Sequence, residues 1–380
     1  MKKKIIYISL VSVLLILAVV IVISRFGKKT TVEETTGDTV TEEQTSSDVP
    51  EESTEDNSVP ETLEYELVIP DIQGIVGDKK DIVVNAMDIA VSNERIYEVA
   101  QIFNSEQQIM AYKLVSFKPD GSDIQFVELE EPSVKMTDDM VEEILFGQDG
   151  NVYAIRSYNP PSPWSLWYSG NLHILVWGAD GTLLSESALE VPNMDDNVQI
   201  RTFNVTKEGN IALLCGLTDG NGFVIHIRKD GSYDGRTEMV HDESYTSWWN
   251  ANDGTFVAYY GERVGSNGQY NYYYKTYDID NRMFSEKVRV IIPGKADEYI
   301  QISGKCTGRN IIIMKKDNYL YRHDVNSEEI KPIVNIKNAG YEGNDFHDLV
   351  MMNDDILVWR YQNLNNQYNN IVAILIPKQK

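Results

Sequence analysis

Residues 144–155, ILFGQDGNVYAI, contain the pattern that decides the fold. An apolar run is followed by a tight turn at Asp149–Gly150 and by a second run of β-branched and aromatic residues, which is typical of a β-hairpin. Similar arrangements recur in FNVTKEGNIALLC (203–215), WNANDGTFVAYY (249–260) and VMMNDDILVWRY (350–361). With weaker matches between them, the turns are spaced by about 45 to 60 residues, which indicates a repeated unit.

A second series of hairpins falls between the first ones, at 112–129, 173–189, 224–239 and 274–288. Two consecutive hairpins form a four-stranded meander, and repeated meanders of this length predict an all-β protein with the fold of a β-propeller. We expect six blades, although a seventh is possible, and a β-sandwich is the structural alternative. The expected blades are residues 84–129, 140–190, 198–240, 244–292, 298–336 and 345–378.

The last expected blade contains only three strand-like runs and ends with NIVAILIP (370–377). An unpaired outer edge invites aggregation. The segment LEYELVIP (63–70) precedes the first blade and has no sheet of its own. We therefore expect this segment to supply the missing outer strand and to close the ring, which places the propeller domain at 63–380.

The N-terminal region contains a candidate membrane anchor. Residues 5–24, IIYISLVSVLLILAVVIVIS, carry no charge and have the length of a helix that spans a bilayer. Arg25 and Lys28 follow this run in place of the small residues of a cleavage site. We expect residues 1–29 to be an uncleaved, single-pass signal anchor, with the N-terminus inside the cell and the folded domain outside.

An acidic linker follows the expected anchor. From Thr30 to Glu66 the chain contains thirteen acidic residues and no Lys or Arg. Such a composition cannot bury a core, so residues 30–62 are predicted to be a disordered stalk. The whole chain carries a formal charge of −24. This charge repels polyphosphates and argues against nucleic acid as a partner.

Long loops are expected on one face of the propeller, where strand two joins strand three and where one blade joins the next. They include 157–171, 261–271 and 361–369, which carry aromatic residues among Asn and Gln. Long loops on a rigid scaffold often bind ligands, and aromatic rings with amides suit sugars and peptides. The alternative is that these rings pack the loops onto one another. The candidate ligand-binding aromatics are Trp164, Trp167, Tyr168, Tyr270, Tyr361 and Tyr368.

Acidic pairs occur in several of the expected connections between blades, shortly before the innermost strands. Their best candidates for ligand contact are Asp139, Asp196 and Asp242. Repeated carboxylates at one mouth of the channel would attract a cationic ligand, a basic peptide or Ca²⁺. The alternative is that the pairs keep the connections hydrated. No calcium-loop motif is present, and we expect no cofactor other than Ca²⁺ bound by carboxylates from several blades.

Motifs of common catalytic sites are absent from the sequence. It contains no Gly-x-Ser-x-Gly elbow, no His-Glu-x-x-His and no Walker loop. Propeller glycosidases can use scattered carboxylates that no spacing would reveal. We therefore assign no catalytic residue.

The meander repeat with Asp–Gly turns resembles the divergent extracytoplasmic β-propellers of Gram-positive bacteria over residues 63–380. The sequence departs from better-defined propeller families, since it lacks the Trp–Asp repeat end of WD-repeat domains and the Gly–Gly doublet of kelch repeats. The resemblance assigns no functional residue. The anchor, the acidic linker and the long loops of one face instead predict a membrane-tethered binding or scaffold module that recognises a protein, peptide or glycan on the loop-rich face. The alternative is a surface glycoside hydrolase or lyase that uses carboxylates at the channel mouth.

Overall fold

The computed structural model describes most of the chain from Thr62 to Lys378. Both the blades and the tight turns between their strands are covered, whereas many of the longer loops are not. The described residues are 62, 64–76, 83–92, 94–104, 106, 108–133, 140–158, 166–168, 171–194, 198–216, 222–239, 247–264, 269–290, 301–302, 305–306, 311–316, 318–324, 329–339, 346–353, 355–362 and 370–378.

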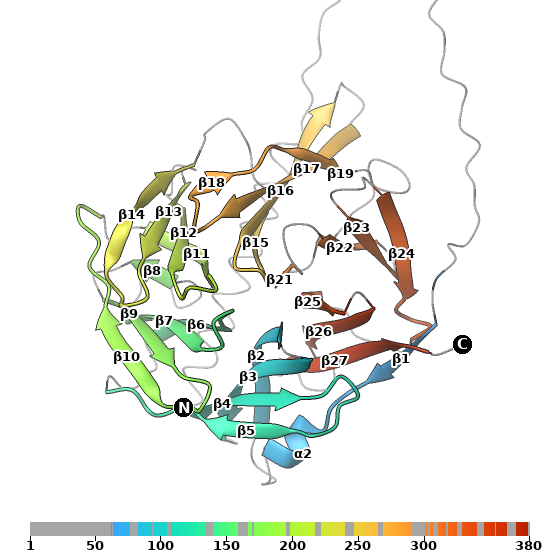
Figure 1. Ribbon diagram of the computed structural model, residues 1–380, viewed down its shortest axis with the longest axis horizontal. Helices are drawn as coiled ribbons and strands as arrows, with labels where there is room; N and C mark the ends of the chain where they lie inside the picture. Colours follow the sequence, from blue (N-terminus) through green and yellow to red (C-terminus); the bar gives the residue numbers. More distant parts are fainter. Residues whose placement is uncertain are drawn as a thin grey trace, which may run out of the picture. The chain divides into compact units, whose positions relative to one another are not determined.

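The fold is an all-β propeller, as the sequence predicts. Within the described residues the strands form six sheets, which are arranged around a centre (Figure 1). The first three blades in chain order have the following strands. Blade 1 contains β2 (Val83–Ser92), β3 (Arg95–Phe103), β4 (Ile109–Phe117) and β5 (Gln125–Glu128); blade 2 contains β6 (Met140–Phe146), β7 (Val152–Tyr158), β9 (Leu172–Trp177) and β10 (Leu183–Ala188); blade 3 contains β8 (Leu166–Tyr168), β11 (Val198–Val205), β12 (Ile211–Gly216), β13 (Gly222–Ile227) and β14 (Tyr233–Glu238).

The C-terminal part of the propeller contains two further blades and an irregular sheet. Their strands are the following. Blade 4 contains β15 (Ser247–Ala251), β16 (Phe256–Val264), β17 (Gln269–Asp278), β18 (Met283–Phe284), β19 (Val288–Val290) and β21 (Lys305–Cys306); the irregular sheet contains β20 (Gln301–Ile302), β22 (Ile311–Lys316), β23 (Tyr319–Asp324) and β24 (Glu329–Asn335); blade 5 contains β25 (Phe346–Met352), β26 (Ile356–Gln362), β27 (Asn370–Pro377) and β1 (Tyr65–Val68).

The number of regular blades differs from the expected six. Five sheets have an inner strand of at least five residues, namely β2, β6, β11, β15 and β25. In the irregular sheet the inner strand β20 has two residues, and the neighbouring β21 instead pairs in parallel with β15 of blade 4. The prediction of six blades is therefore corrected to five regular blades, because the segment that should form the sixth inner strand divides its backbone hydrogen bonds between two sheets.

Closure of the ring follows the prediction. Strand β1 pairs antiparallel with β27, with Tyr65 opposite Pro377 and Val68 opposite Ile374. The N-terminal segment thus becomes the outer strand of the C-terminal blade, and the backbone groups of β27 are paired on both sides. The short helix α2 (Ile72–Val76), which the sequence pattern does not indicate, follows this strand.

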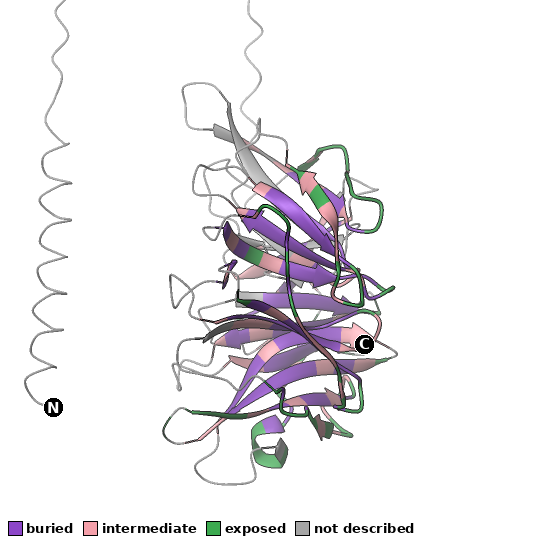
Figure 2. Ribbon diagram, turned by 90° about the vertical axis from the view of Figure 1, so that its left-hand side faces the viewer, coloured by how far each residue is buried: buried purple, intermediate pink, exposed green. Residues whose placement is uncertain are grey.

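The hydrophobic core lies between neighbouring blades. Alternate residues of an inner strand point to opposite faces of its sheet. Accordingly, Ile144 of β6 packs with blade 1, whereas Leu145 packs with blade 3. Figure 2 shows the resulting pattern, in which the strands are mostly buried and the connecting turns are mostly exposed. The blades are thus held together by apolar layers, and side-chain hydrogen bonds such as that from Phe146 N to Asp88 also join neighbouring sheets.

Membrane anchoring is not visible in this structure. No helix in the described part of the chain is long and apolar enough to cross a membrane. The predicted anchor, residues 1–29, and nearly all of the predicted linker, residues 30–62, lie outside the described residues. Both therefore stay predictions.

Candidate functional site

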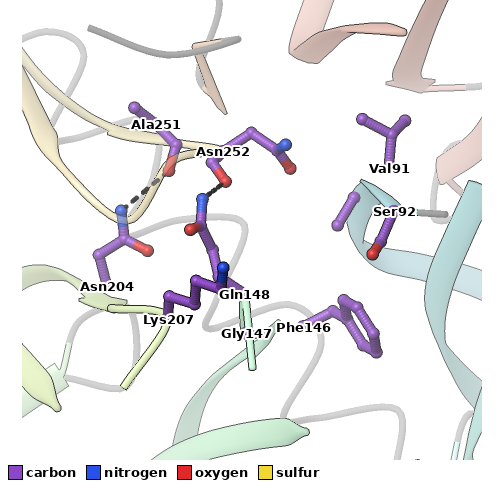
Figure 3. Close-up of a pocket in the computed structure, with 10 residues that line it drawn as sticks. Val91, Ser92, Phe146, Gly147, Gln148, Asn204, Lys207, Ala251 and Asn252 are labelled. Carbon is purple, nitrogen blue, oxygen red and sulfur yellow. Dashed lines mark hydrogen bonds between the residues drawn. The ribbon is translucent and has the colours of Figure 1, made fainter. Parts of the chain in front are cut away.

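A polar cavity of about 280 Å³ lies where the first hairpin turns of blades 2, 3 and 4 face the end of β2 (Figure 3). We call it the turn-side pocket. Its polar lining comes from four blades and consists of Ser92, Gln148, Asn204, Lys207 and Asn252. A cavity of this volume is slightly smaller than a typical drug-sized pocket and has room for one small ring-shaped ligand.

Three of these residues occupy the same position in three equivalent turns. Gln148, Lys207 and Asn252 are each the second residue of a four-residue turn that ends in glycine. The turns close through backbone hydrogen bonds of 3.0–3.1 Å from Gly150, Gly209 and Gly254 to the first residue. These glycines have φ of +86°, +83° and +77°, a conformation that disfavours other residues.

The neighbouring acidic residue of the turn has a structural task. The carboxylate of Asp149 accepts the backbone N–H of Asn151 at 3.1 Å, and that of Asp253 accepts the N–H of Thr255 at 3.2 Å. The second turn position makes no such contact within its own turn. Its side chain is therefore free to vary in chemistry, and in all three blades it lines the pocket.

The polar groups of the pocket differ in the hydrogen-bonding capacity they retain. Asn204 is fully engaged, because its amide nitrogen donates to Ala251 O at 3.1 Å and to Thr255 O at 2.8 Å, and its amide oxygen accepts from Val205 N at 2.9 Å. The amide nitrogen of Gln148 donates to the backbone oxygen of Asn252 and keeps a second N–H (Figure 3). Gln148, Asn252 and Lys207 therefore offer donors to a ligand, and the two amides also offer acceptors.

A second set of polar residues lies on the inner strands, further from the turns than the pocket residues. Each regular blade contributes one residue to this inner-strand set, which consists of Asp88, Glu143, Thr202, Asn250 and Asp348. Thr202 lies two residues before the pocket residue Asn204, which corresponds to about 7 Å along a strand. The inner-strand set thus lies beneath the turn-side pocket.

Hydrogen bonds connect three members of this set across the blades. The hydroxyl oxygen of Thr202 lies 2.9 Å from Glu143 Oε1 and 3.0 Å from Asn250 Oδ1. A hydroxyl has one proton, so it cannot donate to both oxygens. Either a protonated Glu143 donates to Thr202, which donates to Asn250, or the Asn250 amide is turned so that its nitrogen donates to Thr202.

The electrostatic setting favours protonation of Glu143. Burial raises the pKa of Glu143 to about 7, the hydrogen bond from Thr202 opposes this rise, and the negative charges of Asp88 and Asp348 add to it. The other two carboxylates are engaged. Asp88 accepts the backbone N–H of Phe146 at 2.8 Å, and Asp348 forms an ion pair with Arg360 at 2.6 Å. Glu143 is therefore the carboxyl of this set that can exchange a proton near neutral pH.

Two of the aromatic residues predicted to bind ligand are buried instead. Tyr168 belongs to β8, which leaves the long connection of blade 2 and extends blade 3 by pairing with β11; its side chain is buried, and its hydroxyl accepts the Val191 N–H at 3.2 Å. Tyr361 lies on β26 in the core beside Trp359. The expected loop position of both residues is corrected, because their side chains pack between strands, whereas ligand contact by either residue stays a prediction.

The remaining predicted site residues are placed only in part. Trp167 lies on β8 and is half-buried, and its backbone oxygen accepts the hydroxyl of Ser157 at 2.8 Å. Tyr270 lies on β17 opposite Arg263, and only its backbone is described. The other candidates lie outside the described residues; they are Trp164, Tyr368, Asp139, Asp196 and Asp242. The structure therefore does not bring the predicted set together as one site.

Neither metal binding nor a calcium site is seen in the described ranges. These contain no group of three or more His, Cys, Asp or Glu residues that could hold a metal ion. The acidic residues proposed for Ca²⁺ lie outside these ranges, so that expectation stays a prediction.

The turn-side pocket is not among the sites that the sequence predicts. The predicted site lies in the long loops, and the tight turns enter the prediction only as signals of hairpins. One feature of the sequence does point to the pocket. Gln148, Lys207 and Asn252 all carry a hydrogen-bond donor at the same position of the repeat, although the turn conformation does not require a donor there. The inner-strand set gave no comparable signal, because its residues differ in type and spacing.

Among known proteins, this chain is similar to solved propeller structures, and the similarity is in the fold. The sequence matches no family model and no curated protein. The α-L-arabinanase of Penicillium chrysogenum, solved with arabinobiose, has 13% identity and a TM-score of 0.46, over 84% of this chain and 99% of that one. The Fusarium graminearum α-L-arabinofuranosidase Arb93A, solved with an iminosugar inhibitor, has 14% identity and a TM-score of 0.45, over 83% and 97%.

The propeller domain of the Trilobed protease from Pyrococcus furiosus is also similar, with 11% identity and a TM-score of 0.38 over 79% of this chain and 84% of that one. All of these TM-scores lie below 0.5. These similarities therefore carry no argument about what this chain binds or whether it is an enzyme.

Proposed function

We propose that this protein is a membrane-tethered, extracytoplasmic binding module that holds the end of a glycan in the turn-side pocket. The pocket itself is the observation that carries the proposal, because donors and acceptors from several blades converge on a cavity of about 280 Å³. Unengaged amide groups at a cavity suit the hydroxyls of a sugar, which both donate and accept. The tether and the location outside the cell rest on the sequence of residues 1–62.

The test is glycan binding by the full-length chain in detergent micelles. Asn252→Ala removes the side-chain amide but keeps the backbone oxygen that accepts from Gln148, so it should weaken binding at least fivefold without changing stability. Asn338→Ala is the matched control, because Asn338 is an exposed turn residue after β24, outside the pocket. Equal affinity of the wild type and Asn252→Ala for a bound glycan would reject the turn-side pocket as the binding site.

The loop-rich face remains a second proposed contact surface, suited to a protein or peptide. Its proposal rests on Trp164, Trp167 and Tyr270, which the sequence assigns to long connections. Replacing these three residues by Ala should abolish binding of a protein or peptide partner that uses this face. If that binding instead depends on Asn252, the partner uses the turn-side pocket.

A glycoside hydrolase or lyase is the second candidate function. The observation that favours it is the raised pKa of Glu143, which is about 7, near the ionised Asp88 and Asp348. A carboxyl that stays protonated can act as a general acid, while an ionised carboxylate nearby acts as a base or nucleophile. Turnover of a glycan that is lost in Glu143→Gln and in Asp88→Asn, with the fold intact, would support an enzyme. Binding of the same glycan without any turnover would support the binding module.

A further inference from the structure

Lys207 is the one charged residue among the ten that line the turn-side pocket. It is exposed, it lies at the second position of the first turn of blade 3, and no ion pair to it is found within the described part of the chain. Its side chain and that of Gln148 both line the pocket (Figure 3). A lysine ammonium is a compact point charge with three donors, so it can pair with an anion from several directions.

Lys207 lies in an acidic turn, because Glu208 follows it directly and Asp149 of the equivalent turn in blade 2 lies against Gly209. The chain as a whole carries −24, yet the carboxylates beneath the pocket are each compensated. Asp348 is paired with Arg360, Asp88 accepts a backbone N–H, and Glu143 accepts a proton more readily than a free carboxyl does. The only charge that the ten lining residues present directly to a ligand in the pocket is therefore the positive charge of Lys207.

Resting on the proposed function, we infer that the glycan end held in the turn-side pocket is an acidic sugar, with its carboxylate paired to Lys207 and its hydroxyls bonded to Gln148 and Asn252. The carboxylate supplies the anion that the unpaired ammonium lacks. The amides of the equivalent turns contact the neutral part of the sugar. The ligand class is thereby narrowed from glycans in general to those that end in a uronic acid.

Local and overall charge predict opposite preferences, which makes the inference testable. If the net charge of −24 governed recognition, a cationic sugar would bind best. If Lys207 governs it, an anionic sugar binds best. Because Lys207 is exposed, its ion pair is screened by solvent, and the expected gain in affinity is about fivefold at low salt.

The experiment compares the methyl glycosides of glucuronate, glucose and glucosamine, which share one ring and differ in charge. Binding to the full-length chain in detergent micelles is measured by ligand-observed NMR at low ionic strength, in slightly acidic buffer. The expected order of affinity is glucuronate, then glucose, then glucosamine. Lys207→Gln should lower the affinity for glucuronate about fivefold to that for glucose and leave the affinity for glucose unchanged.

The control is Lys229→Gln, which removes an exposed lysine from the outer hairpin of the same blade, outside the pocket. It should preserve the whole order of affinities. The acidic-sugar inference is overturned if glucuronate binds no more tightly than glucose, or if its higher affinity persists in Lys207→Gln. The proposed function still stands in that case, provided that glucose binding depends on Asn252. If none of the three glycosides binds, both fail.

Discussion

The contact region between blades 1 and 2 and the turn-side pocket use the same kinds of side chain in opposite ways. Between the blades, Arg156 forms an ion pair with Glu142, and their side chains are 0% and 5% exposed. In the pocket, Gln148 and Lys207 are exposed. Glu142 and Gln148 are only six residues apart in one hairpin. Polar groups buried between blades therefore stabilise the fold, whereas those at the second turn position remain available for a ligand.

The largest expected effect comes from breaking the buried ion pair. Arg156→Met leaves the Glu142 carboxylate buried without its partner, so the free energy of unfolding should fall by about 3–5 kcal/mol. The double variant Glu142→Leu, Arg156→Met removes both charges and should recover most of this loss. Urea denaturation of the full-length chain measures both. The control is Arg228→Met, which breaks the exposed pair between Arg228 and Asp234 and should cost less than about 1 kcal/mol.

A loss below about 1 kcal/mol in Arg156→Met would contradict a structural role for this pair. The region between blades 1 and 2 would then tolerate an unpaired charge as readily as the molecular surface does. Such a result would remove the contrast with the turn-side pocket.

Two glycines allow the cost of backbone strain in a turn to be measured separately from the cost of a steric clash between blades. Gly150 and Gly181 have nearly equal φ values of +86° and +85°, but a Cβ on Gly150 would meet nothing within 4 Å, whereas one on Gly181 would lie 2.2 Å from Glu128 O of blade 1. Gly150→Ala should therefore destabilise by about 1 kcal/mol, from backbone strain alone. Gly181→Ala should destabilise by about 2–4 kcal/mol. Equal losses in urea denaturation would show that blade 1 yields easily at this contact.

The stability of the protein should depend on pH through Glu98, which is buried between blades 5 and 1. Burial raises the pKa of Glu98 from 4.5 to about 8, and the nearby Arg360 opposes this rise. The folded state then binds the proton more tightly than the unfolded state does. The contribution of Glu98 to the free energy of unfolding is accordingly fully present below about pH 4.5 and is lost as pH rises through about 8, by on the order of 1 kcal/mol per pH unit.

Glu98→Gln should flatten this decline, because the amide does not ionise. Urea denaturation at several values of pH between 5 and 8 is the measurement. Glu143→Gln is a useful comparison, since Glu143 also has a raised pKa but is only partly buried. An unchanged slope in Glu98→Gln would mean that other groups cause the pH dependence.

The smallest expected effect on stability lies in the pocket. Lys207→Gln should change the free energy of unfolding by less than about 0.5 kcal/mol, because an exposed lysine without an ion pair contributes little to the fold. The same urea titrations measure it. A loss of more than about 1 kcal/mol would assign Lys207 a structural role and weaken the contrast between the pocket and the interior.

The architecture could be predicted from local patterns in the chain. Turn dipeptides such as Asp149–Gly150 require a backbone that glycine adopts easily, and the alternating strands beside them determine the hairpins. The closing strand β1 could be predicted because its apolar pattern had no other sheet to join. The count of regular blades could not, since the division of residues 301–306 between two sheets depends on long-range pairing.

The candidate site could be predicted only poorly, for reasons that particular residues show. The sequence pattern places Tyr361 in a long loop with Asn and Gln, but β26 continues to Gln362 and buries its ring. The same pattern places Tyr168 in a long loop, whereas its segment pairs with β11 in the next blade. Neither strand boundaries of this precision nor pairing between blades can be derived from a local pattern.

The sequence by itself determined the repeated hairpins, the all-β class, the closing strand and the acidic character of the chain. These properties depend on turn chemistry, on alternation and on composition, which act over a few residues. The tertiary structure alone decided that Gln148, Lys207 and Asn252 meet at one cavity above Glu143 and Thr202. Turns separated by tens of residues along the chain become neighbours only when the blades pack around a common centre.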